Sequence, residues 1–195
     1  MKTLPLTSSQ TVGPFFAPAL LREDARRHVL TTPETVGERI RIEGRVLDGD
    51  GVPVPDAMVE IWQANAHGRY NHPADTGPAP LDATFLGFGR SGTAEDGSYW
   101  FETIKPGAVP FDGKRQELQA PHIGVTVFAR GLLNHLVTRL YFDDEAANAK
   151  DAILQRVPEE RRATLLARRE PGGTMVVYHF DIVLQGAGET AFFNL

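Results

Sequence analysis

Hydrophobic and polar residues alternate along several short stretches of this chain. Between residues 39 and 48, Ile40, Ile42 and Val46 alternate with charged side chains. A period of two places one set of side chains on a buried face and the other in solvent, so it predicts a half-buried strand. The same reasoning predicts strands over 57–63, 98–103, 122–129, 135–142 and 175–184.

Turns rich in glycine and proline separate these strands. Asp48-Gly-Asp-Gly51, Asp96-Gly97 and Lys105-Pro-Gly107 each mark a break or reversal of the chain. Two other stretches, 144–156 and 158–169, are expected to form short helices. The second of them has acidic residues in its first turn and arginines in its last, which is the arrangement that the helix dipole favours.

Short strands separated by turns, with little helix, predict an all-β fold in the form of a mostly antiparallel β-sandwich. Residues 1–38 mix prolines with polar residues, and we expect an irregular N-terminal arm that belongs to the same unit as the sandwich domain at 39–195. The chain ends with an apolar tail that contains Phe192 and Phe193. Because termini are usually polar and loose, this tail is expected to dock on its own core or on a partner.

Composition and charge exclude several classes of function. The 195-residue chain has no cysteine, so disulfides, thiolate metal sites and a cysteine nucleophile are excluded. A net charge of −5 without long runs of like charge argues against a nucleic-acid or anionic-membrane partner. No apolar run approaches the ~20 residues of a membrane span, and the N-terminus lacks the apolar core of a signal peptide. We therefore expect a soluble, cytoplasmic protein.

Several motifs are specific enough to indicate a family. They are Ser9-Gln-Thr-Val-Gly-Pro-Phe-Phe16, Glu60-Ile-Trp-Gln-Ala64 with Gly68-Arg-Tyr70, Ile104-Lys-Pro-Gly107, Phe128-Ala-Arg-Gly-Leu-Leu133, Thr138-Arg-Leu-Tyr-Phe142 and 180–190. Together they resemble the intradiol catechol dioxygenases over nearly the whole chain, and in particular the α-type chain of a heteromeric member. The resemblance implies a β-sandwich and a reaction in which O₂ opens an aromatic ring between two hydroxylated carbons.

The resemblance also locates a metal site. It implies a ferric ion held by two tyrosines, whose phenolates keep the metal ferric, and two histidines that complete the shell. The four matching positions are Tyr70, Val109, His122 and Gly124, and the place of a family arginine three residues before the first histidine is taken by Gln119. Residues i and i+2 of a strand share a side, so a His-x-His pair can clamp one ion. Val109 and Gly124 have no donor atom, and we therefore expect a vestigial site with no metal bound by this chain.

An incomplete iron site points to a partner. The resemblance implies an α/β heterodimer within a larger symmetric oligomer, in which a homologous β chain binds Fe(III) and the small aromatic substrate reacts with O₂; the isolated chain is expected to be inactive. It also implies that the α chain helps to line the substrate pocket, and the matching positions are Thr11, Gly13, Pro14 and Arg130. Two plainer alternatives remain: Arg130 forms a surface or interface ion pair, and Gly13-Pro14 only shapes a turn.

Two other interpretations of these residues do not assume that an iron site has been lost. Tyr70 and His122 are explained without any metal as a half-buried tyrosine with a hydrogen-bonded hydroxyl and a structural histidine. Alternatively, the chain is a self-sufficient enzyme that binds iron unusually, through Tyr70, His122 and either His67 or His72.

A further alternative belongs to another class of protein, a non-catalytic β-sandwich module that binds carbohydrate or protein. Such modules usually display exposed aromatic side chains. Trp62 and Trp100 fall inside predicted strands, where packing in the core is the expectation. Ligand binding in the absence of a second chain is the observation that favours this alternative.

Overall fold

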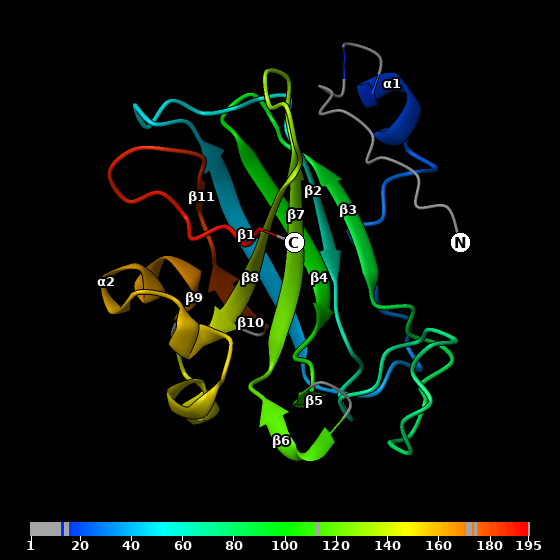
Figure 1. Ribbon diagram of the computed structural model, residues 1–195. Helices are drawn as coiled ribbons and strands as arrows, with labels where there is room; N and C mark the ends of the chain where they lie inside the picture. Colours follow the sequence, from blue (N-terminus) through cyan, green and yellow to red (C-terminus); the bar gives the residue numbers. More distant parts are fainter. Residues whose placement is uncertain (1–12, 14–15, 112–113, 171–172, 174, 195) are drawn as a thin grey trace, which may run out of the picture.

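The computed structural model describes residues 13, 16–111, 114–170, 173 and 175–194, and most of its regular structure is strand (Figure 1). The elements are α1 Phe16–Leu20, β1 Arg39–Leu47, β2 Met58–Trp62, β3 Phe88–Gly92, β4 Ser98–Ile104, β5 Val109–Phe111, β6 Lys114–Gln119, β7 His122–Phe128, β8 Leu136–Phe142, η1 Ala146–Lys150, η2 Leu154–Arg156, α2 Glu159–Arg162, η3 Ala163–Leu165, β9 Leu166–Glu170, β10 Val176–His179 and β11 Ile182–Val183. In the part of the chain that the structure describes, no helix is both long and apolar enough to span a bilayer.

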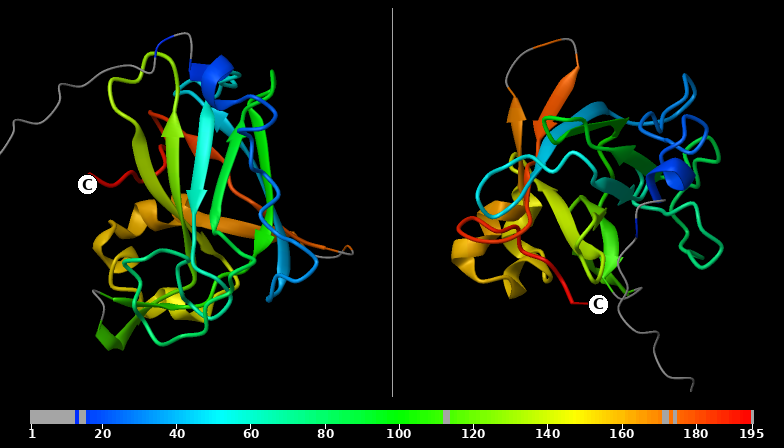
Figure 2. Two further views of the ribbon diagram at one scale, coloured as in Figure 1. Left: turned by 90° about the vertical axis from the view of Figure 1, so that its right-hand side faces the viewer. Right: turned by 90° about the horizontal axis from the view of Figure 1, so that it is seen from above.

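The strands form a sandwich- or barrel-like sheet. Its hydrogen-bonded order is β11-β1-β10-β9-β8-β7-β2-β3, with β4 added on β1, while β5 and β6 form a separate hairpin. Most pairings are antiparallel, as the sequence predicts, and the parallel ones join β1 to β10 and β11, and β8 to β9. The strand β9 connects the two halves of the sheet, because it pairs with β8 on one side and with β10 on the other. The views from the side and from above show the sheet curved around its interior (Figure 2).

The alternation along β1 explains its place in the fold. Ile40 and Ile42 are fully buried, while the intervening charged side chains face outward. The main core consists of apolar side chains from both halves of the sheet, including Ile40, Ile42, Val59, Ile61, Phe101, Val125, Val127, Leu140 and Phe142. A smaller cluster lies where β8 meets the η2–η3 segment and the C-terminal tail; its members are Ala120, Tyr141, Leu154, Val157, Leu165 and Ala191.

The prediction of two short helices at 144–156 and 158–169 is wrong in large part. The first range holds two short 3₁₀ turns, and in the second only α2 and η3 are helical before β9 begins at Leu166. The predicted acidic residues, Glu159 and Glu160, lie in the first turn of α2, whereas the arginines predicted for the last helical turn, Arg168 and Arg169, lie in β9. However, the segment 166–170 pairs with two strands, and Asp143 accepts a hydrogen bond from the backbone N–H of Arg169 at 3.0 Å. These pairings outweigh the local helical preference.

The predicted last strand at 175–184 is interrupted. The carbonyl of Phe180 accepts a hydrogen bond from the Tyr99 hydroxyl at 2.6 Å, and the Asp181 carboxylate accepts one from the backbone N–H of Arg45. The chain therefore forms two strands, β10 and β11, on either side of this contact. Gly44 faces it from β1, where a Cβ atom would lie 1.8 Å from the Phe180 oxygen, so only glycine fits.

Both terminal segments pack on the sheet. In the described part of the arm, Leu30 is buried in the core and its backbone N–H donates to the carbonyl of Glu102 at 2.8 Å. At the other end, the backbone N–H of Phe193 donates to the carbonyl of Val137 at 2.7 Å, and Ala191 is buried. The expectation that the apolar tail docks on its own core is confirmed.

Candidate functional site

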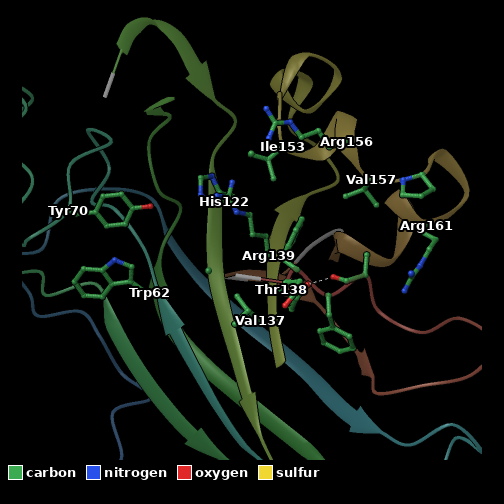
Figure 3. Close-up of a pocket in the computed structure, with 16 residues that line it drawn as sticks. Trp62, Tyr70, His122, Val137, Thr138, Arg139, Ile153, Arg156, Val157 and Arg161 are labelled. Atoms are coloured by element: carbon green, nitrogen blue, oxygen red, sulfur yellow. Dashed lines mark hydrogen bonds between the residues drawn. The ribbon is translucent and has the colours of Figure 1, made fainter. Parts of the chain in front are cut away.

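A cavity of about 530 Å³ opens between β7, β8, the η2–α2 segment and the C-terminal tail (Figure 3). The strand register places its central residues. Gly124 lies opposite Arg139 of β8 on one side and opposite Trp62 of β2 on the other, and His122 lies opposite Tyr141. Because residues two apart on a strand share a side, His122 and Gly124 belong to the same face. Tyr70 reaches the cavity from the loop after β2.

His122 is a neutral histidine with one nitrogen committed to the backbone. Its side chain is buried, and Nδ1 lies 2.7 Å from the carbonyl oxygen of Ala120. A carbonyl only accepts, so Nδ1 carries the proton and Nε2 keeps a free lone pair. Burial lowers the pKa of His122 to about 4, and the positive charge of Arg139 adds to this effect. At neutral pH the side chain is therefore uncharged.

Tyr70 is half-buried, and its ring stacks on Trp62 with the centroids 5.7 Å apart and an interplanar angle of 13°. Its backbone N–H donates to the Asp75 carboxylate at 2.8 Å. Figure 3 shows the phenol oxygen directed toward His122. Burial raises the pKa of the Tyr70 hydroxyl, partly offset by the charge of Arg139, so the phenol is protonated at neutral pH. Among the described residues this hydroxyl has no hydrogen-bond partner. The metal-free interpretation of Tyr70, by contrast, expects a hydrogen-bonded hydroxyl.

The remaining predicted site residues lie beside this cavity. Val109 and Gln119 are backbone partners in the β5–β6 hairpin. Both line an adjoining cavity of about 750 Å³ that shares Trp62 and Tyr70 with the first. A Cβ atom at Gly124 would lie 3.3 Å from the Trp62 carbonyl oxygen, so a larger residue there needs the neighbouring backbone to shift. The structure thus brings all five positions of the predicted vestigial site together.

Arg139 is the central residue that sequence reasoning missed. Its guanidinium donates to Oε1 of Gln119 at 2.7 Å and approaches the Tyr141 hydroxyl at 3.4 Å. Both partners are neutral, and among the described residues no carboxylate lies within ion-pair distance of it. The sequence contains the information needed to find it, because a hairpin that turns near Gly131 places Arg139 directly opposite Gly124. A guanidinium therefore stands beside the position where the resemblance expects a metal ligand.

A buried carboxylate, also missed, organises the back of the cavity. Asp151 is 0% exposed and accepts hydrogen bonds from the Ala120 N–H at 2.8 Å and from the Tyr141 hydroxyl at 3.1 Å. The backbone N–H groups of Ile153 and Leu154 donate to it at 3.0 and 2.7 Å. It therefore links the residue before β7, the strand β8 and the start of η2.

The donors at the cavity do not match the two-tyrosine, two-histidine set. Among the described residues no three His, Asp or Glu side chains gather closely enough to hold a metal ion. Tyr70 and His122 are the donors of the expected kind, and Val109 and Gly124 supply none. His67 and His72 are both exposed, and His72 also lines the adjoining cavity, with its ring edge-on to Trp62 at 6.4 Å and Nδ1 accepting from the backbone.

The prediction that both tryptophans pack in the core is wrong. Trp62 is 37% exposed and lines both cavities. Trp100 is half-buried on the outer face of β4, where the Arg41 guanidinium lies 4.2 Å from its ring and His28 packs edge-on against it. Both residues occupy strand positions that alternate away from the core, so their side chains point outward.

Of the proposed pocket-lining residues, Arg130 lies away from this cavity. Arg130 is in the turn between β7 and β8, eight residues beyond His122, so the two are roughly 25 Å apart along the strand. Its side chain is 66% exposed and forms an ion pair with Asp56. Gly13 has a φ of 72°, which favours glycine. Thr11 and Pro14 lie outside the described residues. The arm helix α1 and the β7–β8 turn share one end of the molecule (Figures 1 and 2).

Comparisons with known proteins agree with the fold and the motifs. Residues 11–186 match the family model described as Dioxygenase. The dioxygenase domain of a dioxygenase carbohydrate-binding protein fusion from Streptomyces sp. SirexAA-E superposes with a TM-score of 0.63 at 29% identity, over 94% of this chain and 97% of that chain. Catechol 1,2-dioxygenase from Pseudomonas arvilla C-1, at 20% identity, shares the fold with a TM-score of 0.62 over 81% of this chain and 55% of its own.

The chain belongs to the intradiol ring-cleaving dioxygenases, a family of oxidoreductases that generally use Fe(III). Over its full length it is 45% identical to the protocatechuate 3,4-dioxygenase alpha chain of Burkholderia cepacia, covering all of that chain. It is 41% identical to the alpha chain of Pseudomonas putida, covering 98% of it. The beta chain from Burkholderia cepacia is 40% identical over 95% of this chain and 78% of its own length.

Proposed function

We propose that this chain is the α subunit of a heteromeric protocatechuate 3,4-dioxygenase in the cytoplasm. The complex cleaves 3,4-dihydroxybenzoate with O₂ to 3-carboxy-cis,cis-muconate, a step of aromatic degradation in the β-ketoadipate pathway. A homologous β chain supplies the ferric ion, and α/β pairs assemble into a larger symmetric oligomer. In this proposal the chain itself folds as an antiparallel sandwich. The observation that carries the proposal is that Val109 and Gly124, two of the four positions that match the family's metal ligands, have no donor atom in a chain that is 45% identical to an alpha chain over its full length.

The donor set supports the absence of iron from this subunit. A ferric site of this family is held by two phenolates, and Tyr70 is the one tyrosine at the four matching positions. Val109 and Gly124 offer no donor atom. Arg139 contributes a positive charge that lies within reach of both remaining donors, since it shifts the pKa of each.

The opposite end of the molecule supports a role in the partner's pocket. Arg130 presents a guanidinium, the group best suited to a carboxylate, and its ion pair with Asp56 holds it in place. Leu133, in the same turn, is 67% exposed, as expected for a residue that a partner covers. In the proposal the arm residues Thr11, Gly13 and Pro14 line the same pocket. Because Arg130 is remote from His122, it serves a site in another chain in this proposal.

Iron content and visible absorbance test the proposal. The chain is purified alone, and then co-expressed with the homologous β chain, after growth with iron. The expected result is a colourless, iron-poor chain alone and a coloured complex with iron in the β subunit. Iron at about one per chain in the protein alone, with phenolate-to-iron absorbance, contradicts the proposal and favours the self-sufficient enzyme that uses Tyr70 and His122.

A substitution tests the role of Arg130 separately. In the complex, Arg130→Gln is expected to raise KM for 3,4-dihydroxybenzoate while leaving iron content unchanged, because the lost interaction is with the substrate carboxylate. Catechol, which has no carboxylate, should be turned over equally by both proteins. The matched control is Arg45→Gln, another exposed arginine paired with an aspartate, here Asp96. Equal losses on the two substrates would instead indicate a structural role at the interface.

A further inference from the structure

We propose that Asp56 and Thr93 are positioning residues for Arg130, which in the proposed function meets the substrate carboxylate in the partner's pocket. Asp56 holds the guanidinium by its Nε, which leaves the two terminal NH₂ groups for the substrate, and Thr93 holds the turn that carries Asp56. The inference rests on the proposed role of Arg130. It adds a physical reason why an exposed arginine keeps one orientation.

Asp56 and Arg130 face each other beyond the ends of β2 and β7. Met58, the first residue of β2, is paired antiparallel with Phe128, the last residue of β7. Two residues further out on each side, the same register places Asp56 opposite Arg130 and on the same face of the sheet. The Asp56 carboxylate accepts a hydrogen bond from Nε of Arg130, and the two side chains form an ion pair. The strand register, therefore, brings these two side chains together.

Thr93 fixes the backbone on both sides of Asp56. It follows β3 directly, and its hydroxyl donates to the carbonyl of Val54 at 2.7 Å and accepts from the backbone N–H of Ala57 at 3.0 Å. The backbone N–H of Thr93 also donates to the Ala57 carbonyl at 3.0 Å. Ala57 itself is 0% exposed. The short side chain of Asp56 therefore extends from a turn that one threonine holds at both ends.

Arg130 has little else to hold it. It lies in the turn between β7 and β8, and its side chain is exposed. Among the residues that the structure describes, Asp56 is the one hydrogen-bond and ion-pair partner of its guanidinium. A long side chain that is free in solution loses rotamer freedom when a ligand fixes it, and this loss weakens binding. An arginine that Asp56 already orients avoids part of the loss.

The bond to Asp56 occupies one edge of the guanidinium. Nε carries one of its five N–H donors, and the two terminal nitrogens carry the rest. A substrate carboxylate can therefore accept end-on from both terminal NH₂ groups, which is a bidentate arrangement that arginine favours. Asp56 also places a negative charge near that carboxylate, but water and salt screen this repulsion at an exposed site. Removal of Asp56 is thus expected to weaken substrate binding, because the lost orientation outweighs the relieved repulsion.

Steady-state kinetics of the iron-loaded complex test this inference. We expect Asp56→Ala to raise KM for 3,4-dihydroxybenzoate about three- to tenfold at an unchanged kcat, and to leave the turnover of catechol, which has no carboxylate, unchanged. Thr93→Val should raise the same KM by a smaller factor, and Thr93→Ser, which keeps the hydroxyl, should restore it. The matched control is Asp96→Ala, at another aspartate paired with an exposed arginine, Arg45, and it should leave KM unchanged. Circular dichroism and iron content confirm that each complex is intact.

A double variant shows whether Asp56 acts through Arg130. Asp56→Ala combined with Arg130→Gln should have the KM of Arg130→Gln alone, because no guanidinium is left to orient. The inference is overturned if Asp56→Ala lowers KM or leaves it unchanged while Arg130→Gln raises it, or if the two losses multiply in the double variant. If Arg130→Gln itself leaves KM unchanged, the proposed pocket role of Arg130 fails and this inference fails with it. The single variants therefore distinguish the two failures.

Discussion

Asp151 gives the sharpest test of how the cavity is built. Its carboxylate is completely buried and accepts four hydrogen bonds, from the Tyr141 hydroxyl and from the backbone N–H groups of Ala120, Ile153 and Leu154. The perturbations are Asp151→Asn, which keeps the shape and removes the charge, and Asp151→Ala, which removes all four acceptor contacts.

The expected magnitudes follow from the contacts. An asparagine oxygen can still accept on the side of Tyr141 and η2, but its NH₂ group then faces the Ala120 N–H, which is left unsatisfied at a cost of about 1–3 kcal/mol. The other bonds also lose their charge assistance, so we expect Asp151→Asn to lower the free energy of unfolding by about 2–4 kcal/mol. The alanine variant leaves four buried donors without acceptors and a cavity, and should lose more than about 4 kcal/mol.

Urea denaturation followed by circular dichroism measures these losses. With a slope of about 2 kcal/mol/M, the asparagine variant should unfold at a midpoint about 1–2 M lower, with an unchanged slope. The matched control is Asp143→Asn, because that exposed carboxylate accepts from the backbone N–H of Arg169 alone. It should cost less than about 1 kcal/mol. An Asp151→Asn variant as stable as the control would refute the view that this carboxylate holds the cavity together.

Other expected results concern pH and packing. Because the pKa of His122 is about 4 in the folded chain and 6.5 unfolded, the unfolded state binds more protons between these values. The stability that His122 contributes is complete above pH 6.5 and is lost as the pH falls toward 4, by up to about 3 kcal/mol; His122→Asn should flatten this part of a stability-versus-pH curve. Gly44→Ala should destabilise by more than about 3 kcal/mol in urea denaturation, because its Cβ would overlap the Phe180 oxygen, whereas Gly51→Ala, with open space around it, should cost about 1 kcal/mol. Tyr99→Phe should cost about 1–3 kcal/mol in the same assay, since the buried Phe180 carbonyl loses its donor; a loss below about 0.5 kcal/mol would mean that water replaces the hydroxyl.

The strands in whose sequence hydrophobic and polar residues alternate could be predicted, whereas those that depend on distant partners could not. The alternation in β1 and β7 is visible locally, and both strands lie within a residue of their predicted bounds. In the glycine-rich β3 the burial alternates, but its sequence shows no alternation of hydrophobic and polar residues, and the charges of β9 suit a helix terminus. Its pairing with β8 and β10 is a contact between segments far apart in the chain, which no local pattern contains.

The same distinction applies to the site. Tyr70, Val109, Gln119, His122 and Gly124 were found through motifs, and the structure brings them together. Asp151 was not found, because nothing in its neighbourhood shows that four donors from three segments converge on it. The identity of Arg139 was visible, but its importance depends on which residue stands opposite it across the hairpin. Roles that arise from such juxtaposition can be assigned only when the fold is known.

The position of β1 has a consequence for synthesis of the chain. This strand is among the first parts of the domain to leave the ribosome, yet its neighbours β10 and β11 lie at residues 176–183, near the C-terminus. Until they emerge, one hydrogen-bonding edge of β1 stays unpaired next to its buried-type residues Ile40 and Ile42. Pairings over such sequence separations form slowly and leave strand edges open to other chains. A nascent chain that stalls before residue 176 therefore carries an aggregation-prone edge, and the last residues made are the ones that protect the first strand.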